Sequence, residues 1–301
     1  MEIIVKKIFS RRYILVGLVA AISLSSYLLA SHLVYRIGFP LDDAWIHQTY
    51  ARNLANNFEW SFIPGNPSAG STAPFWSALL ALGYLLGLAP YIWSYLLGCI
   101  ILVFIAVQGM AIYEKFLPNR ENSAVWVGLF LALEWHLVWA AASGMETILA
   151  ALLIFAVINH LLNKQINWLT VGILVGLSVW IRPDGLTLFG PVIVAIVFRH
   201  KNWLGRLRSL GYFSIGFALF IIPYLSFNRM LAGAWWPNTL FAKQAEYALL
   251  RQEPLLNRYI KQLSLPLVGS GAILLPGLIY FLVRAVRQRR WVALAGVIWM
   301  L

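Results

Sequence analysis

Charged residues and cysteines are both scarce in this chain of 301 residues. Only 11% of the residues are Asp, Glu, Lys or Arg, whereas 61% are hydrophobic. Soluble domains carry roughly 25% charged residues, so the composition excludes an ordinary soluble protein and indicates that lipid surrounds much of the chain. Cys99 is the single cysteine, which excludes a disulfide within the chain.

Apolar runs of roughly 18 or more residues recur along the chain, and such runs can cross a hydrocarbon core of about 30 Å as helices. The first, Tyr13 to Tyr35, is too long for the apolar region of a cleaved signal peptide, so we expect an uncleaved signal anchor. Further crossings are expected at Tyr91 to Ile112, Ser123 to Ala142, Glu146 to Leu162, Trp168 to Ile181, Leu186 to Phe198 and Tyr212 to Phe227. The sequence therefore predicts an all-α, polytopic transmembrane helical bundle. It forms one domain over residues 1–301, with the last helix expected to be incomplete at its C-terminus.

Acidic residues are few, 11 against 23 basic ones, and the net charge is +12. The basic residues stand in short blocks between apolar runs, which indicates membrane topology rather than nucleic-acid binding. The blocks are Lys6/Lys7/Arg11/Arg12, Lys115/Arg120, Lys164, Arg199/Lys201/Arg206/Arg208 and Arg284/Arg287/Arg289/Arg290. If these loops face the cytoplasm, most acids lie on the other side of the membrane.

The segment Thr72 to Ala89 decides whether this topology is consistent. If it crossed the membrane, Glu146 would lie on the cytoplasmic side and the later basic blocks would lie outside. If it is re-entrant or lies on the surface, Glu146 shares a face with Asp42 and every basic block is cytoplasmic. We expect the second arrangement.

An acidic pair, Asp42-Asp43, lies in the first outer loop, residues 36–71. It precedes the stretch Ala44 to Phe58, where apolar residues recur every four positions, which predicts an amphipathic helix at the membrane surface. One Asp would be explained as a helix cap. Two carboxylates next to the bilayer favour a functional role.

Three further polar clusters are expected on the same face. They are Ser143-Gly144-Met145-Glu146, Arg182-Pro183-Asp184-Gly185, and Trp235-Trp236-Pro237-Asn238-Thr239 followed by Lys243 in the long outer loop, residues 228–263. Each has a structural explanation: a dipole partner, a snorkelling arginine, an interfacial tryptophan belt or a solvated lysine. Their shared side of the membrane favours function.

These motifs, taken in order, resemble the GT-C membrane glycosyltransferases, and most closely the bacterial arabinofuranosyltransferase branch, which is related to protein O-mannosyltransferases. The segments that carry the resemblance are Leu41 to Ile46, Tyr50 to Leu54, Pro64-Gly65-Asn66, Ser71 to Trp76, Ser143 to Thr147, Arg182 to Gly185 and Pro237 to Lys243. Trp45 and His47 depart from the pattern expected for the family. The resemblance covers most of the chain.

The resemblance implies that a sugar passes from a polyprenyl-phosphate donor to an acceptor hydroxyl of a glycan, lipid or protein. The site would face outward from the plasma membrane of a bacterial cell. Asp42 would be the general base, with Asp43 orienting it or binding metal. Arg182 and Lys243 would hold the donor phosphate. The expected substrate-binding residues are Glu146, Asp184, His47 and Asn238.

No cofactor is certain from the sequence. A divalent cation, Mg²⁺, Mn²⁺ or Ca²⁺, would need oxygen ligands such as Asp43 and Glu146, because the sequence has no His/Cys metal motif.

Two other classes of function remain open. A lipid or solute transporter would use Glu134 and His136, which lie inside an apolar segment. In a structural subunit of an envelope assembly, the acidic pair would have no functional role.

Overall fold

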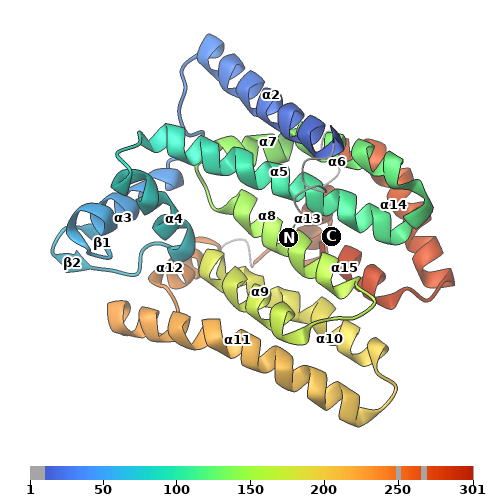
Figure 1. Cartoon of the computed structure of the whole chain (residues 1–301). Helices are drawn as coiled ribbons and strands as arrows, with labels where there is room; N and C mark the ends of the chain where they lie inside the picture. The colour runs from blue at the N-terminus through green and yellow to red at the C-terminus, as the bar shows by residue number, and fades with distance from the viewer. Residues whose placement is uncertain (1–10, 249–251, 266–269, 301) are drawn as a thin grey trace.

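The computed structural model describes residues 11–248, 252–265 and 270–300, and about 80% of the structure is helical (Figure 1). The described strands form a two-stranded antiparallel hairpin, β1 (Ser61–Ile63) and β2 (Asn66–Pro67). The helices are α2 (Arg11–Val34), α3 (Asp43–Asn57), α4 (Pro74–Leu85), α5 (Pro90–Phe116), α6 (Ala124–Leu133), α7 (Trp135–Ala142), α8 (Thr147–Leu161), α9 (Trp168–Ile181), α10 (Phe189–Arg199), α11 (Trp203–Ala232), α12 (Asn238–Glu246), α13 (Leu255–Ser264), α14 (Ser270–Arg287) and α15 (Trp291–Met300). Two 3₁₀ segments, η1 (Pro118–Ser123) and η2 (Pro183–Leu188), complete the described elements.

Within the described residues, three helices are long and apolar enough to cross a membrane: α2, α5 and α11. A fourth crossing is available if α6 and α7, which meet at an angle of 53°, form one broken span. Crossings are also expected at α8, α9 and α10. These helices have 15, 14 and 11 residues and are shorter than the three long helices. Helix α9 has the bounds expected from the sequence, whereas the 3₁₀ segment η2 includes Leu186 to Leu188, which the apolar run would place in α10.

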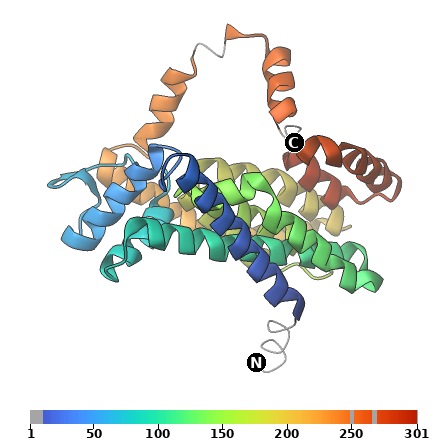
Figure 2. The ribbon, with the colours of Figure 1, turned by 90° about the horizontal axis from the view of Figure 1, so that it is seen from above.

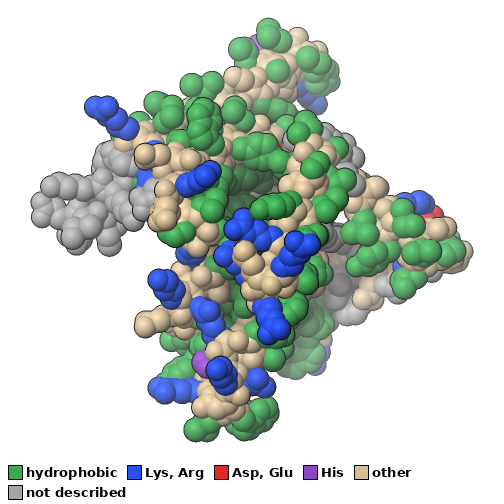
Figure 3. Space-filling view, turned by 90° about the vertical axis from the view of Figure 1, so that its right-hand side faces the viewer, with side chains coloured by type: hydrophobic (Ala, Val, Ile, Leu, Met, Phe, Trp, Pro, Cys, Tyr) green, Lys and Arg blue, Asp and Glu red, His purple; other side chains and the backbone are tan. Residues whose placement is uncertain are grey.

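Among the described residues, the basic blocks and the acidic motifs lie at opposite ends of the bundle. α5 and α8 each run from the end that carries α3 and α4 toward the end that carries the α14–α15 turn (Figure 1). At that second end Arg12 contacts Glu114 at 2.7 Å, and the guanidinium of Arg290 lies 5.4 Å from the ring centre of Phe116. Figure 3 shows Lys and Arg side chains distributed across this end among hydrophobic ones. We call it the basic end, and the end with α3 and α4 the site end.

Helices α9 and α11 pack closely because small residues stand at their contact. A Cβ atom added at Gly172 would overlap the carbonyl oxygen of Phe213, and one at Gly216 would overlap that of Leu169. Small residues let the two backbones approach, which is how helices gain packing energy where lipid removes the hydrophobic drive to associate.

The segment Thr72 to Ala89 forms only the short helix α4, which stays at the site end. Its 12 residues span about 18 Å, less than the hydrocarbon core. The indole Nε1 of Trp76 donates to Gly144 O at 2.9 Å, and that of Trp93 donates to Leu79 O at 2.8 Å. This arrangement agrees with a segment that does not cross the membrane.

Helix α3 differs from the expected surface-lying amphipathic helix. Its polar side chains His47, Gln48 and Asn53 are buried, whereas Phe58, expected on the apolar face, is 86% exposed. The polar face is covered because it bonds to the rest of the site end. Gln48 donates to Ser94 Oγ and accepts from Tyr84 Oη, and Asn53 donates to the carbonyls of Ser61 and Phe62.

Two helices of residues 228–263, the segment expected to be a long outer loop, extend away from the bundle (Figure 2). These are α12 and α13, and the polar residues of α13 alternate with exposed Leu255, Leu256, Tyr259 and Ile260.

Candidate functional site

A buried carboxylate, Glu146, lies at the centre of the site end. Only 3% of this residue is exposed, at the N-cap position of α8. Its Oε2 lies 3.1 Å from Nε2 of His47 on α3. This distance allows an ion pair when His47 is protonated, and Oε2 has no hydrogen-bond partner among the described residues.

The guanidinium of Arg182 links Glu146 to a second acid. Arg182 Nη1 lies 3.4 Å from Glu146 Oε1, and Arg182 Nε lies 3.2 Å from Asp184 Oδ1. Asp184 is well exposed, so the chain of charges runs from the buried carboxylate toward the surface. Two of the five guanidinium N–H groups are thereby engaged, and the two on Nη2 stay available to a ligand.

The backbone turn after α9 positions this arginine. The Arg182 amide donates to Ser178 O at 2.8 Å, and the Gly185 amide donates to Arg182 O at 2.9 Å. Pro183 cannot continue an α-helix, so Arg182 is extended and its side chain points back toward α8.

His47 is fixed through its other ring nitrogen. Nδ1 lies 3.2 Å from both Ser71 Oγ and Ser77 Oγ, and the two hydroxyls lie 3.0 Å apart. With a serine hydroxyl donating to Nδ1, the proton of a neutral imidazole sits on Nε2, facing Glu146. From the sequence, Ser71 was named only within the segment Ser71 to Trp76, without a role of its own, and Ser77 was not named.

Opposing influences act on the pKa of Glu146. Burial raises it, whereas contact with His47 and the charge of Arg182 lower it, and together the partners hold the pKa below its usual value. Glu146 is therefore ionised at neutral pH.

The turn before Glu146 depends on glycine. Gly144 has φ of +71°, a conformation that other residues adopt at a cost, and a Cβ there would meet the ring of Phe39. Its carbonyl accepts the hydrogen bond from Trp76, and Ser143 Oγ accepts from the Met145 amide at 3.1 Å. The turn thereby directs Glu146 at His47.

The acidic pair lies at the start of α3, and both residues are exposed. Asp42 Oδ1 accepts a hydrogen bond from the Asp43 amide at 3.0 Å, so Asp42 acts as the N-cap in this structure. Asp43 precedes His47 by four residues and therefore lies on the same helix face. The acidic pair and the buried cluster thus belong to one end of the molecule.

A cavity of about 260 Å³ opens beside the arginine. Its polar lining includes Arg182, Asp184, Thr147 and Thr187, and its apolar lining extends down α8 to Ile154 and across to Trp299 on α15. A polar group at one end of an otherwise apolar cavity is the arrangement that an amphiphilic ligand requires.

The remaining expected residues are less closely tied to this centre. Asn238 begins α12 and is exposed, and no hydrogen bond or ion pair joins it to Glu146 or Arg182 among the described residues. Lys243 lies in α12, but its side chain is outside the described part of the chain. The nearby Trp236 contacts Tyr224, which in turn contacts Trp180 of α9.

Within the described residues, no group of three or more His, Cys, Asp or Glu side chains is gathered closely enough to hold a metal ion. Asp43 and Glu146, the expected oxygen ligands, are thus not part of such a group.

Comparisons of the chain with protein-family models, with curated proteins and with solved structures find no match.

Proposed function

We propose that this chain is an integral, multi-pass membrane glycosyltransferase that moves a sugar from a polyprenyl-phosphate donor to an acceptor hydroxyl. The observation that carries the proposal is that three separated motifs meet: His47 of α3, Glu146 before α8 and Arg182 after α9. The reaction also needs a place for the lipid chain of the donor and a base for the acceptor proton. The cavity beside Arg182 would hold the lipid chain, and the exposed acidic pair at the same end would take the proton.

The donor phosphate would bind at the Nη2 group of Arg182. The leaving polyprenyl phosphate gains negative charge as the bond between its oxygen and the anomeric carbon breaks, and a guanidinium stabilises that charge. The apolar lining around Ile154 would accept the first part of the polyprenyl chain. Lys243 is a second proposed contact to the phosphate.

The acceptor proton would pass to the acidic pair. As the acceptor oxygen bonds to the anomeric carbon, its proton moves to a carboxylate, either Asp42 as the sequence predicts or its neighbour Asp43. Asp42 already uses Oδ1 in capping α3, which leaves Oδ2 for a proton. Paired asparagine variants distinguish the two carboxylates.

His47 and Glu146 would act through Arg182. Both are almost fully buried, so in this conformation they position the guanidinium rather than contact the sugar. Asp184 and Asn238, which are exposed, are the proposed contacts to sugar or acceptor, and a divalent ion at Asp43 would assist the base if transfer proves sensitive to chelation.

The separation of charges supports an outward-facing site. By the positive-inside rule, the basic end faces the cytoplasm and the site end faces the other side of the membrane. In a bacterial cell the proposed reaction would then take place on the outer face of the plasma membrane.

One observation favours the alternative, a transporter of lipid or solute. Glu134 stands at the break between α6 and α7, where its Oε2 accepts from the Leu137 amide at 3.0 Å and its Oε1 lies 2.7 Å from His136 Nδ1. Broken helices with an acid at the break are common at transport sites. Glu134→Gln would abolish transport by such a protein and leave sugar transfer unchanged.

The decisive assay uses the purified chain in detergent with a radiolabelled polyprenyl-phosphate sugar and a panel of acceptors. Transfer that disappears in Arg182→Ala and persists in Glu134→Gln supports the glycosyltransferase. Label that crosses a vesicle membrane without being transferred supports the transporter instead.

A further inference from the structure

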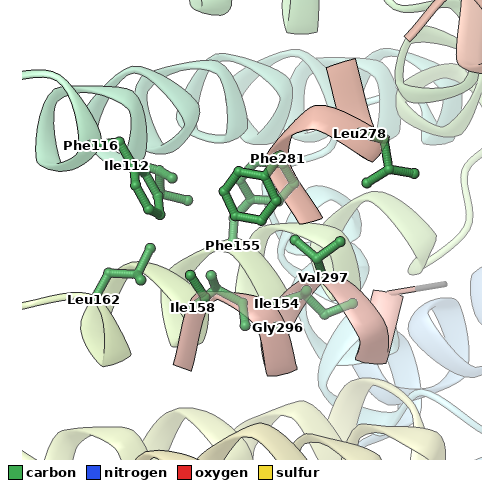
Figure 4. Close-up of a pocket in the computed structure, with 11 residues that line it drawn as sticks. Ile112, Phe116, Ile154, Phe155, Ile158, Leu162, Leu278, Phe281, Gly296 and Val297 are labelled. Carbon is green, nitrogen blue, oxygen red and sulfur yellow. The ribbon is translucent and has the colours of Figure 1, made fainter. Parts of the chain in front are cut away.

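Two adjoining apolar cavities lie between α5, α8, α14 and α15, toward the basic end. The first, of about 280 Å³, is lined by hydrophobic side chains and one glycine. Phe155 of α8 and Phe281 of α14 both line it, and Figure 4 shows Ile112 and Phe116 of α5 to the left of these two rings. The second, of about 430 Å³, shares Phe155 and Phe281 and continues outward to Arg284 and Arg290.

Both cavities are partly open at the surface of the helical bundle rather than enclosed. An apolar ligand could therefore enter them from the surrounding bilayer. A flexible hydrocarbon chain fills such a space and needs no polar partner, whereas water needs two or more.

The outer part of these cavities is strongly cationic. Arg284 lies beside Tyr280, to whose hydroxyl its Nη1 donates at 3.2 Å, and Arg290 lies over the ring of Phe116. A third hollow of about 360 Å³ beside them is lined by Lys115, Arg199, Arg289 and Arg290, among other residues. None of the residues that line the three cavities is acidic. Figure 3 shows the Lys and Arg side chains around an apolar hollow at this end.

One of the arginines is held in an unfavourable backbone conformation. Arg289 has φ of +52° in the turn between α14 and α15, where the Arg290 amide donates to Ala285 O at 2.8 Å. Helices commonly end with glycine at a left-handed position of this kind. A guanidinium stands here although glycine would fit the turn with less strain.

We propose that these cavities bind one phospholipid with an anionic headgroup, its acyl chain between Phe155 and Phe281 and its phosphate against Arg284 and Arg290. The charge of the cavity rim indicates which lipid binds. The rim is cationic and no residue of the cavity linings is acidic, so it matches an anionic lipid in the leaflet at the basic end. The first cavity shares Ile154 with the cavity beside Arg182, but the headgroup contacts at Arg284 and Arg290 lie at the basic end and do not depend on the proposed reaction.

The test is a titration of the delipidated full chain, followed by native mass spectrometry. Phosphatidylglycerol should bind more tightly than phosphatidylcholine. In Arg284→Gln/Arg290→Gln, phosphatidylglycerol should bind about 25-fold more weakly, at about 1 kcal/mol per cation near a membrane surface, while phosphatidylcholine binding stays unchanged. The matched control, Lys201→Gln/Arg208→Gln, removes the same charge from the same end but outside the cavity linings, and should bind as the unchanged chain does.

Three outcomes overturn the proposal. Equal weakening in the control variant would show attraction to diffuse charge rather than a site. Displacement by glycerol phosphate, which has no acyl chains, would show a site for free anions. Displacement by polyprenyl phosphate at lower concentration would assign the cavities to the donor lipid.

The variant Arg289→Gly distinguishes an effect on lipid binding from an effect on folding. It is expected to raise the stability of the chain and to lower its affinity for the lipid. The lipid-free variant should melt at a higher temperature than the unchanged chain, since glycine relieves the turn. Its affinity for phosphatidylglycerol should nevertheless fall about fivefold. Unchanged or tighter lipid binding would remove Arg289 from the site and contradict the reason given for its conformation.

Discussion

Trp76 Nε1 donates a hydrogen bond of 2.9 Å to the carbonyl oxygen of Gly144, across 68 residues of sequence. The bond ties the short helix α4 to the turn that carries Glu146. His47 also bonds to Ser77 on that same helix. The cluster of His47, Glu146 and Arg182 is therefore held by α4 on one side and by α8 and α9 on the other.

The first prediction concerns this turn. Gly144→Ala should lower the free energy of unfolding by about 1 to 3 kcal/mol, because alanine adopts the left-handed conformation at a cost and its Cβ meets Phe39. Thermal unfolding in detergent measures the loss. Gly190→Ala is the matched control: nothing lies within 4 Å of its Cβ, and alanine in a helix should stabilise by up to about 1 kcal/mol. A Gly144→Ala protein as stable as Gly190→Ala would contradict the strained-turn account.

The second prediction concerns the buried pair. His47→Ala should destabilise the protein by about 1 to 3 kcal/mol, because the carboxylate of Glu146 then loses a partner in a buried place. Adding Glu146→Gln should restore part of that loss, since no buried charge remains to be compensated. A double-mutant cycle gives the coupling. Strictly additive losses would mean that the 3.1 Å contact between the two side chains has no energetic effect.

The third prediction concerns pH. The pKa of Glu146 in the folded protein lies below its ordinary value of 4.5, so the unfolded chain binds more protons between those two values. The stabilisation is therefore fully present above about pH 4.5 and is lost as the pH falls through the folded pKa. Unfolding measured from pH 7 down to pH 3 should show a decline that Glu146→Gln lacks. Identical pH profiles for the two proteins would contradict a lowered pKa.

The fourth prediction concerns the donor phosphate. Arg182→Ala should weaken binding of a polyprenyl-phosphate sugar by about 1.5 to 3 kcal/mol. Arg182→Lys should restore only part of it, because an ammonium group cannot contact Glu146, Asp184 and a phosphate with one planar fork. Equilibrium binding of a radiolabelled donor measures both. Unchanged affinity in Arg182→Ala would move the phosphate to another cation, such as Lys243 or Arg229.

The fifth prediction concerns topology. In a Cys99→Ser background, cysteines at Thr187 and Phe58, both exposed at the site end, should react with an impermeant thiol reagent added to intact cells. Cysteines at Lys201 and Gln288, exposed at the basic end, should react only after lysis. The reverse pattern would invert the assignment of the two ends.

Much of the architecture could be predicted from the sequence, because helix content and charge segregation follow from local composition. The apolar runs predict α2, α5 and α11, and the basic blocks predict that α4 does not cross. The burial of the polar face of α3 could not be predicted. His47, Gln48 and Asn53 find their partners in Ser71, Ser77, Ser94 and the β1 backbone, and periodicity contains no information about distant partners.

The candidate site was predictable in part. The sequence indicated Glu146, Arg182 and Asp184 as polar groups of one face, and the structure brings them into contact. The pairing of His47 with Glu146 depends on the Gly144 turn and on Trp76, and that geometry exists only after α3, α4 and α8 have packed together.

The most direct test of the central claim is the rate of sugar transfer by the purified chain and by its Asp42→Asn and Asp43→Asn variants. Asparagine keeps the size and most of the capping capacity of aspartate, so folding should be retained, within about 1 kcal/mol for a lost cap. Loss of a general base should lower the rate by about 100- to 10,000-fold in at least one of the two variants. Near-normal transfer in both variants, or no transfer by the unchanged chain from any polyprenyl-phosphate sugar, would contradict the glycosyltransferase.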